Sequence, residues 1–172
     1  FPVHIPAGAD FEAIFMSGDT AMNVDLVDFE PPTTQAVEAE SGAILGSASI
    51  YTDAAASGGR GVAYISSQNA GFRLSNVPAA SGVNIRYASE LSGSLSILVN
   101  GTLERAVDFF PTGGWIGSYG LVSIPVDIPA RADFEIVFMN GDTAMNVDRV
   151  DFVAANTVDP APEPNSEPDP TP

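Results

Sequence analysis

The sequence predicts an all-β protein, a β-sandwich jelly roll made of two antiparallel sheets. Its composition, with 45% hydrophobic residues, 16 glycines and 14 prolines but only 16% charged residues, is typical of strands joined by many turns. Apolar residues fall in short runs bounded by Gly, Ser, Asn and Asp, and no stretch shows a helical period. Many short strands without helices pack most simply as two layered sheets.

The apolar runs predict about ten strands. They lie at 37–40, 44–51, 61–65, 71–74, 83–88, 95–99, 103–109, 121–126, 134–139 and 147–153. Asn100-Gly101 separates two of these runs, and both central positions of a tight type I′ turn require positive φ. We therefore expect a hairpin at this point.

A duplication defines the domain organisation. Residues 1–29 and 124–152 match at 22 of 29 aligned positions, which indicates an internal repeat. We interpret 1–30 as the C-terminal remnant of an upstream sister module, 31–35 as a linker and 36–154 as one whole module. Residues 155–172 are rich in proline and acid, which predicts a disordered linker. Starting at Phe1, the chain is expected to be an excised fragment whose targeting signal lies elsewhere.

The charge balance limits the partners. The formal net charge is −16, all six basic residues are arginine, and cysteine is absent. Such a surface repels nucleic acid and anionic membranes, and it disfavours sulfated or uronic-acid-rich polymers at low salt. Neutral glycans are the easier ligands.

Catalysis finds little support in the residues. The only histidine is His4, in the remnant, and no serine lies in a Gly-x-Ser-x-Gly turn. A pair of carboxylates could hydrolyse glycosides, but most of the acids are interpreted as a solvated surface. We expect a domain that is not an enzyme.

A few acids stand at positions that suggest a metal. Glu38 and Glu40 lie two residues apart in a predicted strand and therefore point to one face, while Asp148 and Asp151 lie in the last predicted strand. If the first and last strands are neighbours, these carboxylates could hold Ca²⁺, which takes six to eight oxygen ligands. The alternative is that they are ordinary exposed strand acids.

Aromatic side chains could bind sugar by stacking on the apolar face of a pyranose ring. Trp115, the only tryptophan, lies in the glycine-rich segment PTGGWIGSYG, which favours a surface role over core packing. Tyr64 and Tyr119 are further candidates, and packing against the sandwich is the alternative for both.

The order of several segments resembles carbohydrate-binding modules of families 6 and 35, with family 6 the closer match. The segments are VEAE, SGGRGVAYI, SGVNIRYAS, TGGW and GDTAMNVDRVDF, which together span nearly all of 35–153. The resemblance implies a β-jelly roll without enzymatic activity.

The resemblance also implies site residues. Glu38, Glu40 and Asp148 match the carboxylates that hold a structural calcium in the family. Trp115 and Tyr64 match an aromatic pair that encloses a terminal sugar, although Ala63 stands where the family has glycine. Asn146 matches the asparagine that hydrogen-bonds this sugar.

These observations predict a non-catalytic module that targets a secreted, extracellular bacterial enzyme to a neutral polysaccharide beside a tandem sister module. The alternative is a structural or adhesive extracellular repeat that assembles through its N-terminal strands. Part of a glycosidase catalytic domain is a third, weaker interpretation.

Overall fold

The computed structural model describes residues 33–154. The predicted remnant at 1–30 and the predicted linker at 155–172 lie outside the described residues. The first strand begins at Thr34, so Thr34 and Gln35 belong to the module and not to the predicted 31–35 linker.

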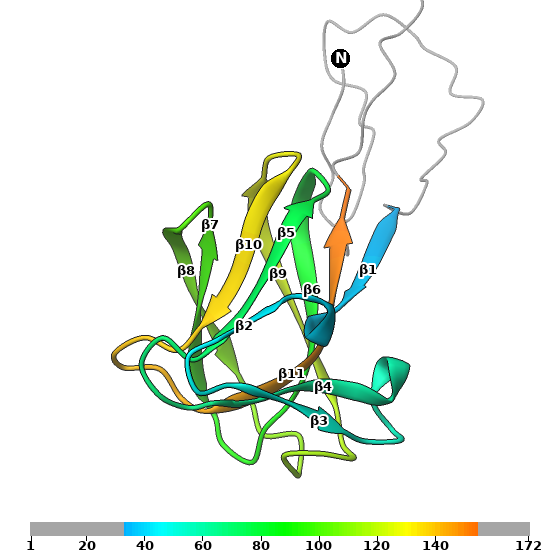
Figure 1. Ribbon diagram of the computed structural model, residues 1–172, viewed down its shortest axis with the longest axis vertical. Coiled ribbons are helices and arrows are strands. Elements are labelled where there is room, and N and C mark those ends of the chain that lie inside the picture. The colour runs from blue at the N-terminus through cyan, green and yellow to red at the C-terminus, as the bar shows by residue number, and fades with distance from the viewer. Residues whose placement is uncertain (1–32, 155–172) are drawn as a thin grey trace, which may run out of the picture. The chain divides into compact units, whose positions relative to one another are not determined.

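Eleven strands and two single turns of 3-10 helix make up the described part of the chain (Figure 1). The strands are β1 (Thr34–Glu38), β2 (Ala43–Leu45), β3 (Ser49–Thr52), β4 (Arg60–Ile65), β5 (Gly71–Val77), β6 (Ala80–Ala88), β7 (Gly93–Val99), β8 (Thr102–Phe109), β9 (Gly120–Ile128), β10 (Ala132–Val137) and β11 (Met145–Val153). The 3-10 turns are η1 (Ala39–Ser41) and η2 (Ser57–Gly59). The described residues contain no helix long and apolar enough to cross a membrane.

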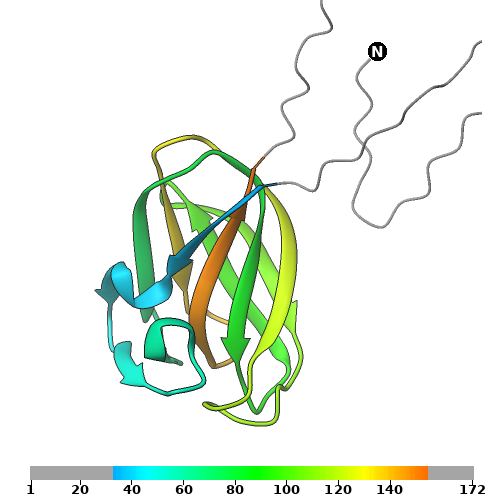
Figure 2. The same ribbon diagram turned by 90° about the vertical axis from the view of Figure 1, so that its right-hand side faces the viewer.

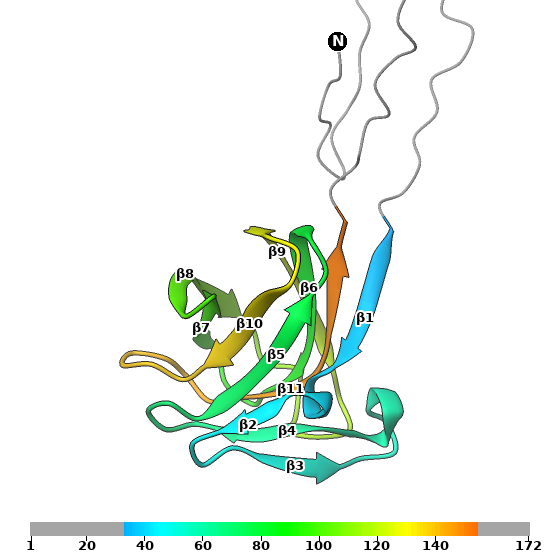
Figure 3. The same ribbon diagram turned by 45° about the horizontal axis from the view of Figure 1, so that its top comes forward.

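Two antiparallel sheets form the sandwich, which confirms the predicted fold class. One sheet has the order β3-β4-β11-β6-β9, with β1 also paired to β11, and the other has the order β2-β5-β10-β7-β8. Figure 2 shows β11, in orange, beside the green β6, and Figure 3 shows β1 alongside β11. First and last strands are therefore neighbours, with Glu38 opposite Arg149.

One predicted strand, 44–51, was wrong because it forms two. Gly46 has φ +57, and a Cβ there would lie 2.6 Å from the Asn69 carbonyl oxygen. The chain therefore turns at Gly46, so that β2 joins one sheet and β3 joins the other.

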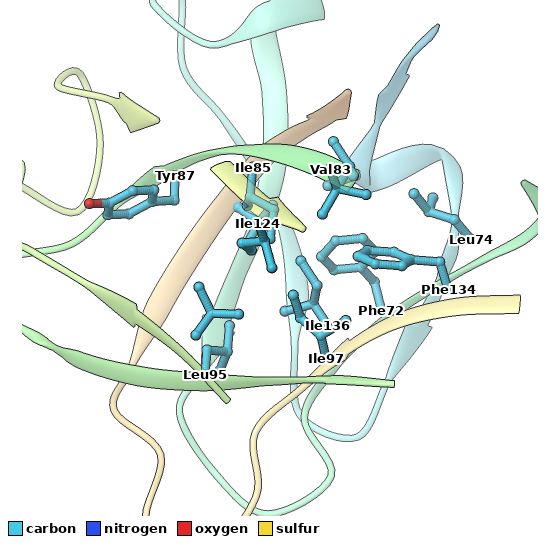
Figure 4. Packing of buried hydrophobic residues seen from close by; sticks show 14 of the residues in the cluster. Phe72, Leu74, Val83, Ile85, Tyr87, Leu95, Ile97, Ile124, Phe134 and Ile136 are labelled. Atoms are coloured by element: carbon cyan, nitrogen blue, oxygen red, sulfur yellow. The ribbon is translucent and has the colours of Figure 1, made fainter. Parts of the chain in front are cut away.

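The core lies between the sheets and comes from the alternating residues of the strands (Figure 4). Phe72 and Phe134 are fully buried, and the rings of Phe134 and Phe152 meet edge to face with centroids 5.4 Å apart. Aromatic pairs favour this arrangement because a ring edge is positive and a ring face negative.

The predicted Asn-Gly hairpin is confirmed. Asn100 and Gly101 have φ values of 51° and 76°, and they join the antiparallel strands β7 and β8. Both central residues thus adopt the left-handed conformation that this turn requires.

The strand β11 connects the two ends of the sandwich. Its C-terminal half pairs with β1, and its first residues pair with β4. Ala154 donates a backbone hydrogen bond to the Thr33 carbonyl, so the described chain enters and leaves the module at one end. The loop between β8 and β9 lies at the other end (Figure 1).

Candidate functional site

A cleft of about 720 Å³ lies at the end of the sandwich opposite to these chain ends. It is lined by the end of β3, the end of β4, the start of β11 and two loops, through residues 51–52, 63–66, 90, 114–116 and 144–146. Three predicted sugar-binding residues, Tyr64, Trp115 and Asn146, are among them. The structure thus brings together residues that are far apart in the sequence.

Tyr64 projects from an irregular point in β4. Met145 of β11 pairs with Ile65 and Val147 pairs with Val62, so the register shifts and Ala63 and Tyr64 form a bulge. Tyr64 has φ 57°, a left-handed conformation that is unfavourable for a bulky residue, and its side chain is 66% exposed. Bulges of this kind redirect side chains next to functional sites.

Trp115 is half-buried in the loop between β8 and β9. Gly113 and Gly117 on either side have φ values of 98° and 77°, which lets the chain turn before and after Trp115. Gly114 forms a β-bridge with Ser89 in the neighbouring loop. The glycine-rich sequence around Trp115 is thus the means by which the loop places this side chain at the cleft.

Asn146 helps to hold this loop. Its side-chain nitrogen donates a hydrogen bond to the Trp115 carbonyl at 2.6 Å, and the residue is only 7% exposed. Asn146 therefore lines the cleft and also supports the backbone of the tryptophan.

The fourth predicted sugar-binding residue, Tyr119, lies behind the cleft and does not line it. Its hydroxyl donates to Asp53 Oδ2 at 2.6 Å and lies 3.0 Å from the Tyr51 hydroxyl, while the Arg86 guanidinium lies 4.1 Å from its ring centroid. Burial, together with the bond to Asp53, raises the pKa of Tyr119. Tyr119 therefore supports the cleft wall through Tyr51, which does line the cleft.

The predicted metal-binding acids gather around η2. Ser57 donates its hydroxyl to Glu38 Oε1 at 2.7 Å and its backbone N–H to Asp148 Oδ1 at 2.9 Å. A Cβ on Gly58 would lie 3.6 Å from both the Glu38 carboxyl carbon and Glu40 Oε1. The three acids thus approach one turn from two strands and from η1.

Glu38 and Glu40 do not lie in one strand, as was predicted, although their carboxylates do come together. Glu38 is the last residue of β1 and Glu40 lies in η1. Ser41 donates its hydroxyl to the Glu38 carbonyl, and Gly42 donates its N–H to the Ala39 carbonyl. These bonds close a 3-10 turn around the buried Ala39 in place of extended backbone.

These acids differ in how well they fit a cation. Glu38 Oε2 and Glu40 Oε2 are buried and have no hydrogen-bond partner, which is costly for a carboxylate and would be relieved by a cation. Asp148 is fully buried and already has partners, because Arg86 pairs with its second oxygen. No three acidic, histidine or cysteine side chains of residues 33–154 form a metal cluster alone, so hydroxyl, backbone or water oxygens would have to complete a site.

Asp151, the other acid singled out in the last strand, is paired elsewhere. Its Oδ1 lies 2.7 Å from Arg149 Nε, and hydrogen bonding to Asp151 raises the pKa of Arg149. Asp151 is therefore a structural partner of Arg149.

Four residues of this region escaped the sequence analysis: Asp53, Ser57, Arg86 and Glu90. Glu90 lines the cleft, and Arg86 connects the buried Asp148 to the ring of Tyr119. Ser57 and Arg86 lie within the segments SGGRGVAYI and SGVNIRYAS, but no role was drawn from them, and Asp53 and Glu90 lie outside the segments that carry the resemblance. Only the position of Arg86 in an alternating strand indicated that its side chain lies on the face opposite to the core.

Comparison with known proteins identifies the fold through solved structures. Neither a protein-family profile nor a curated protein matches the sequence. A family 35 carbohydrate-binding module from Clostridium thermocellum matches with a TM-score of 0.62 and 29% identity, over 70% of this chain and 98% of that module. A family 35 module from Paenibacillus barcinonensis matches with 0.62 and 26%, over 70% and 99%.

An enzyme structure also matches. The exo-β-1,3-galactanase of Phanerochaete chrysosporium gives a TM-score of 0.62 at 22% identity, over 69% of this chain. The match spans only 29% of the galactanase chain. The matched part is thus a minor part of the enzyme but almost all of each isolated family 35 module.

The described part of the chain therefore has the jelly-roll fold of carbohydrate-binding modules. The comparisons include family 35 modules, while the preference for family 6 stays a prediction.

Proposed function

We propose that this chain is a non-catalytic module that binds a neutral polysaccharide in the loop-end cleft. The observation that carries the proposal is that Trp115 and Tyr64 line one cleft, with Tyr64 mostly exposed in a strained backbone conformation. An exposed aromatic ring held at such a cost is expected at a binding site. The structural likeness to carbohydrate-binding modules supports the same role.

The chemistry of the cleft suits a sugar. The indole of Trp115 and the phenol of Tyr64 offer flat apolar surfaces for the C–H faces of a pyranose, and Asn146 and Glu90 offer polar atoms for its hydroxyls. Each aromatic stack contributes about 1 kcal/mol in addition to the free energy of burying its apolar area. With only a few such contacts, we expect dissociation constants on the order of micromolar to millimolar.

Glu90 supports the preference for neutral sugars. It is the only charged side chain among the described residues that line the cleft, and it is exposed. A carboxylate accepts hydrogen bonds from sugar hydroxyls but repels the carboxylate of a uronic acid. The net charge of −16 acts in the same direction.

We also propose that the module serves a secreted bacterial polysaccharide-degrading enzyme, beside a tandem sister module represented by residues 1–29. The likeness to isolated family 35 modules, which this chain matches over almost their whole length, supports a module that accompanies other domains. A second copy would raise the apparent affinity for a repeating polymer through effective concentration.

A structural calcium ion is part of this proposal. Glu38 and Glu40 would hold it through their unpartnered oxygens. Asp148, whose two oxygens already bond Ser57 and Arg86, would not be a ligand, so hydroxyl, backbone or water oxygens would complete the site. When bound, the ion would neutralise the buried carboxylates and join η1 to η2. We propose no metal ion in the glycan cleft itself.

The test is a screen of neutral and uronic polysaccharides by affinity gel and calorimetry, with calcium present. Trp115→Ala and Tyr64→Ala should each weaken binding at least about tenfold, as expected for losing an aromatic stack. Phe110→Ala is the matched control, because Phe110 is 75% exposed and does not line the cleft. Glu90→Gln should reduce the difference in affinity between neutral and uronic polysaccharides.

Failure of the folded protein to bind any polymer would reject the proposal. It would favour the structural repeat, which concentration-dependent assembly of the full chain would then test.

A further inference from the structure

The loop that carries Trp115 is held from two sides. On one side, Asn146 donates to the Trp115 carbonyl at 2.6 Å. On the other, Asp53 Oδ2 accepts two hydrogen bonds, from the Gly117 N–H and from the Tyr119 hydroxyl, each at 2.6 Å. Residues 115, 117 and 119 are thus tied to two different parts of the fold, β11 and the segment after β3.

Asp53 is itself firmly placed. Its other oxygen accepts from the Ala55 N–H at 3.0 Å, and its own N–H donates to the Gly59 carbonyl at 3.0 Å. The carboxylate therefore has three donors, and an aspartate with such local bonds is a stable turn element. This turn gives the loop a fixed point of attachment.

Tyr119, which donates its hydroxyl to Asp53, is also held in place. Tyr119 lies beneath Arg86, and Arg86 also donates to the Ala55 carbonyl at 3.1 Å. The same arginine pairs with the buried Asp148. A chain of contacts thus runs from the buried Asp148 through Arg86 and Tyr119 to Asp53, which bonds the Trp115 loop at the surface.

We infer that Asp53 is a positioning residue for ligand binding, which holds Trp115 at the cleft through Gly117 and Tyr119 without lining the cleft itself. The part of this inference that concerns glycan affinity rests on the proposed function. The part that concerns the loop does not. A hydrogen bond to a charged acceptor is stronger than one between neutral groups, so the carboxylate holds the loop better than an amide can.

Several titratable or charged groups face this carboxylate: Tyr119 directly, Tyr51 and Arg86 beside it, and Asp148 beyond Arg86. The hydrogen bond from Tyr119 lowers the pKa of Asp53 below its ordinary value of 3.8. A carboxyl group with a lowered pKa in the folded state stabilises that state above its unfolded-state pKa, and this contribution is lost as pH falls through the folded-state pKa. The hydrogen bonds from Gly117 and Tyr119 to the Asp53 carboxylate should therefore persist at neutral and mildly acid pH and be lost only in strong acid.

The experiment uses the full chain, in which Trp115 is the only tryptophan and its fluorescence reports the loop directly. Emission and glycan affinity are measured for wild type, Asp53→Ala, Asp53→Asn and Tyr119→Phe. Tyr119→Phe keeps the ring beneath Arg86 and removes only the hydroxyl. Asp127→Ala, an exposed acid on β9, is the matched control.

Asp53→Ala should shift the emission of Trp115 to longer wavelength and weaken glycan binding about tenfold, whereas Tyr119→Phe should give a smaller change of the same kind. The changes in emission and affinity caused by Asp53→Asn should lie between those of Asp53→Ala and Tyr119→Phe. The affinity of wild type should fall more steeply than that of Asp53→Asn as pH drops below 3.8, because only wild type loses the carboxylate at this position.

Unchanged emission and affinity in Asp53→Ala and Tyr119→Phe would overturn the inference. If Asp53→Ala does not fold, Tyr119→Phe and the two pH profiles decide. A wild type that binds no glycan would reject the proposed function, while a shifted emission in Asp53→Ala would still support the role of Asp53 in the loop.

Discussion

Tyr64 has a backbone conformation that lowers the free energy of unfolding, and its exposed side chain is not packed well enough to offset this loss. Its φ is 57° and the residue is 66% exposed. A left-handed conformation costs a non-glycine residue roughly 1–2 kcal/mol. The bulge in β4 imposes this conformation because Tyr64 has to fit between two paired positions, Val62 and Ile65.

Tyr64→Gly should therefore separate stability from binding. Glycine adopts this φ freely, so the free energy of unfolding should rise by about 1 kcal/mol or less, since glycine also loses more entropy on folding. Sugar affinity should fall because the ring is gone. Urea denaturation measures the stability, and Tyr64→Ala, which removes the ring but keeps the strain, is the control. A glycine variant less stable than the alanine variant would contradict this account.

At the scale of elements, two short turns lie against β11: η1, which follows β1, and η2, which lies between β3 and β4. The two orphaned carboxylate oxygens lie there, on Glu38 and Glu40. Arg60 lies 3.8 Å from Glu40 and is too exposed to offset this burial fully. Such a local excess of negative charge is expected to lower stability unless a cation binds.

Calcium should then raise the thermal stability of the protein, and a chelator should reverse the effect. A ligand at 100 times its dissociation constant stabilises by about 2.7 kcal/mol. Glu38→Gln with Glu40→Gln should abolish the response, and Glu104→Gln, on the exposed part of β8, should not. Differential scanning calorimetry with and without Ca²⁺ provides the measurement. Equal melting temperatures in both conditions would argue for ordinary buried acids.

At the scale of the whole molecule, β11 separates the chain ends from the cleft. Its first residues, Met145 and Asn146, line the cleft, while Val153 lies opposite Thr34 beside the chain ends. A strand of nine residues spans roughly 30 Å. Within the module, the points where the described chain begins and ends thus lie at the end opposite to the cleft.

Residues 32–155 form one compact unit, and all the described core residues belong to it. A fragment limited to 32–155 should therefore unfold in one cooperative transition with the melting temperature of the full chain, because no described core contact is removed. Circular dichroism of the two proteins makes the comparison. A melting temperature several degrees lower in the fragment would mean that residues outside this unit contribute to stability.

Sequence patterns determined the fold class and much of the cleft. Alternating apolar residues and the Asn100-Gly101 turn are local signals, and local backbone preference is enough to place strands and a hairpin. Trp115 among glycines was recognisable because a bulky aromatic in a flexible loop is a poor core residue. The resemblance to carbohydrate-binding modules supported Tyr64 and added Asn146, and both line the same cleft as Trp115.

Only the tertiary structure decided which side chains share a partner. It moved Tyr119 from the cleft to the support behind it, brought Glu40 to Glu38 through a 3-10 turn in place of a strand, and paired Asp148 with Arg86. It also revealed Asp53 and Glu90 beside the Trp115 loop and the cleft. These contacts join residues up to 66 positions apart in the chain, and they depend on strand register and loop path, which no local spacing encodes.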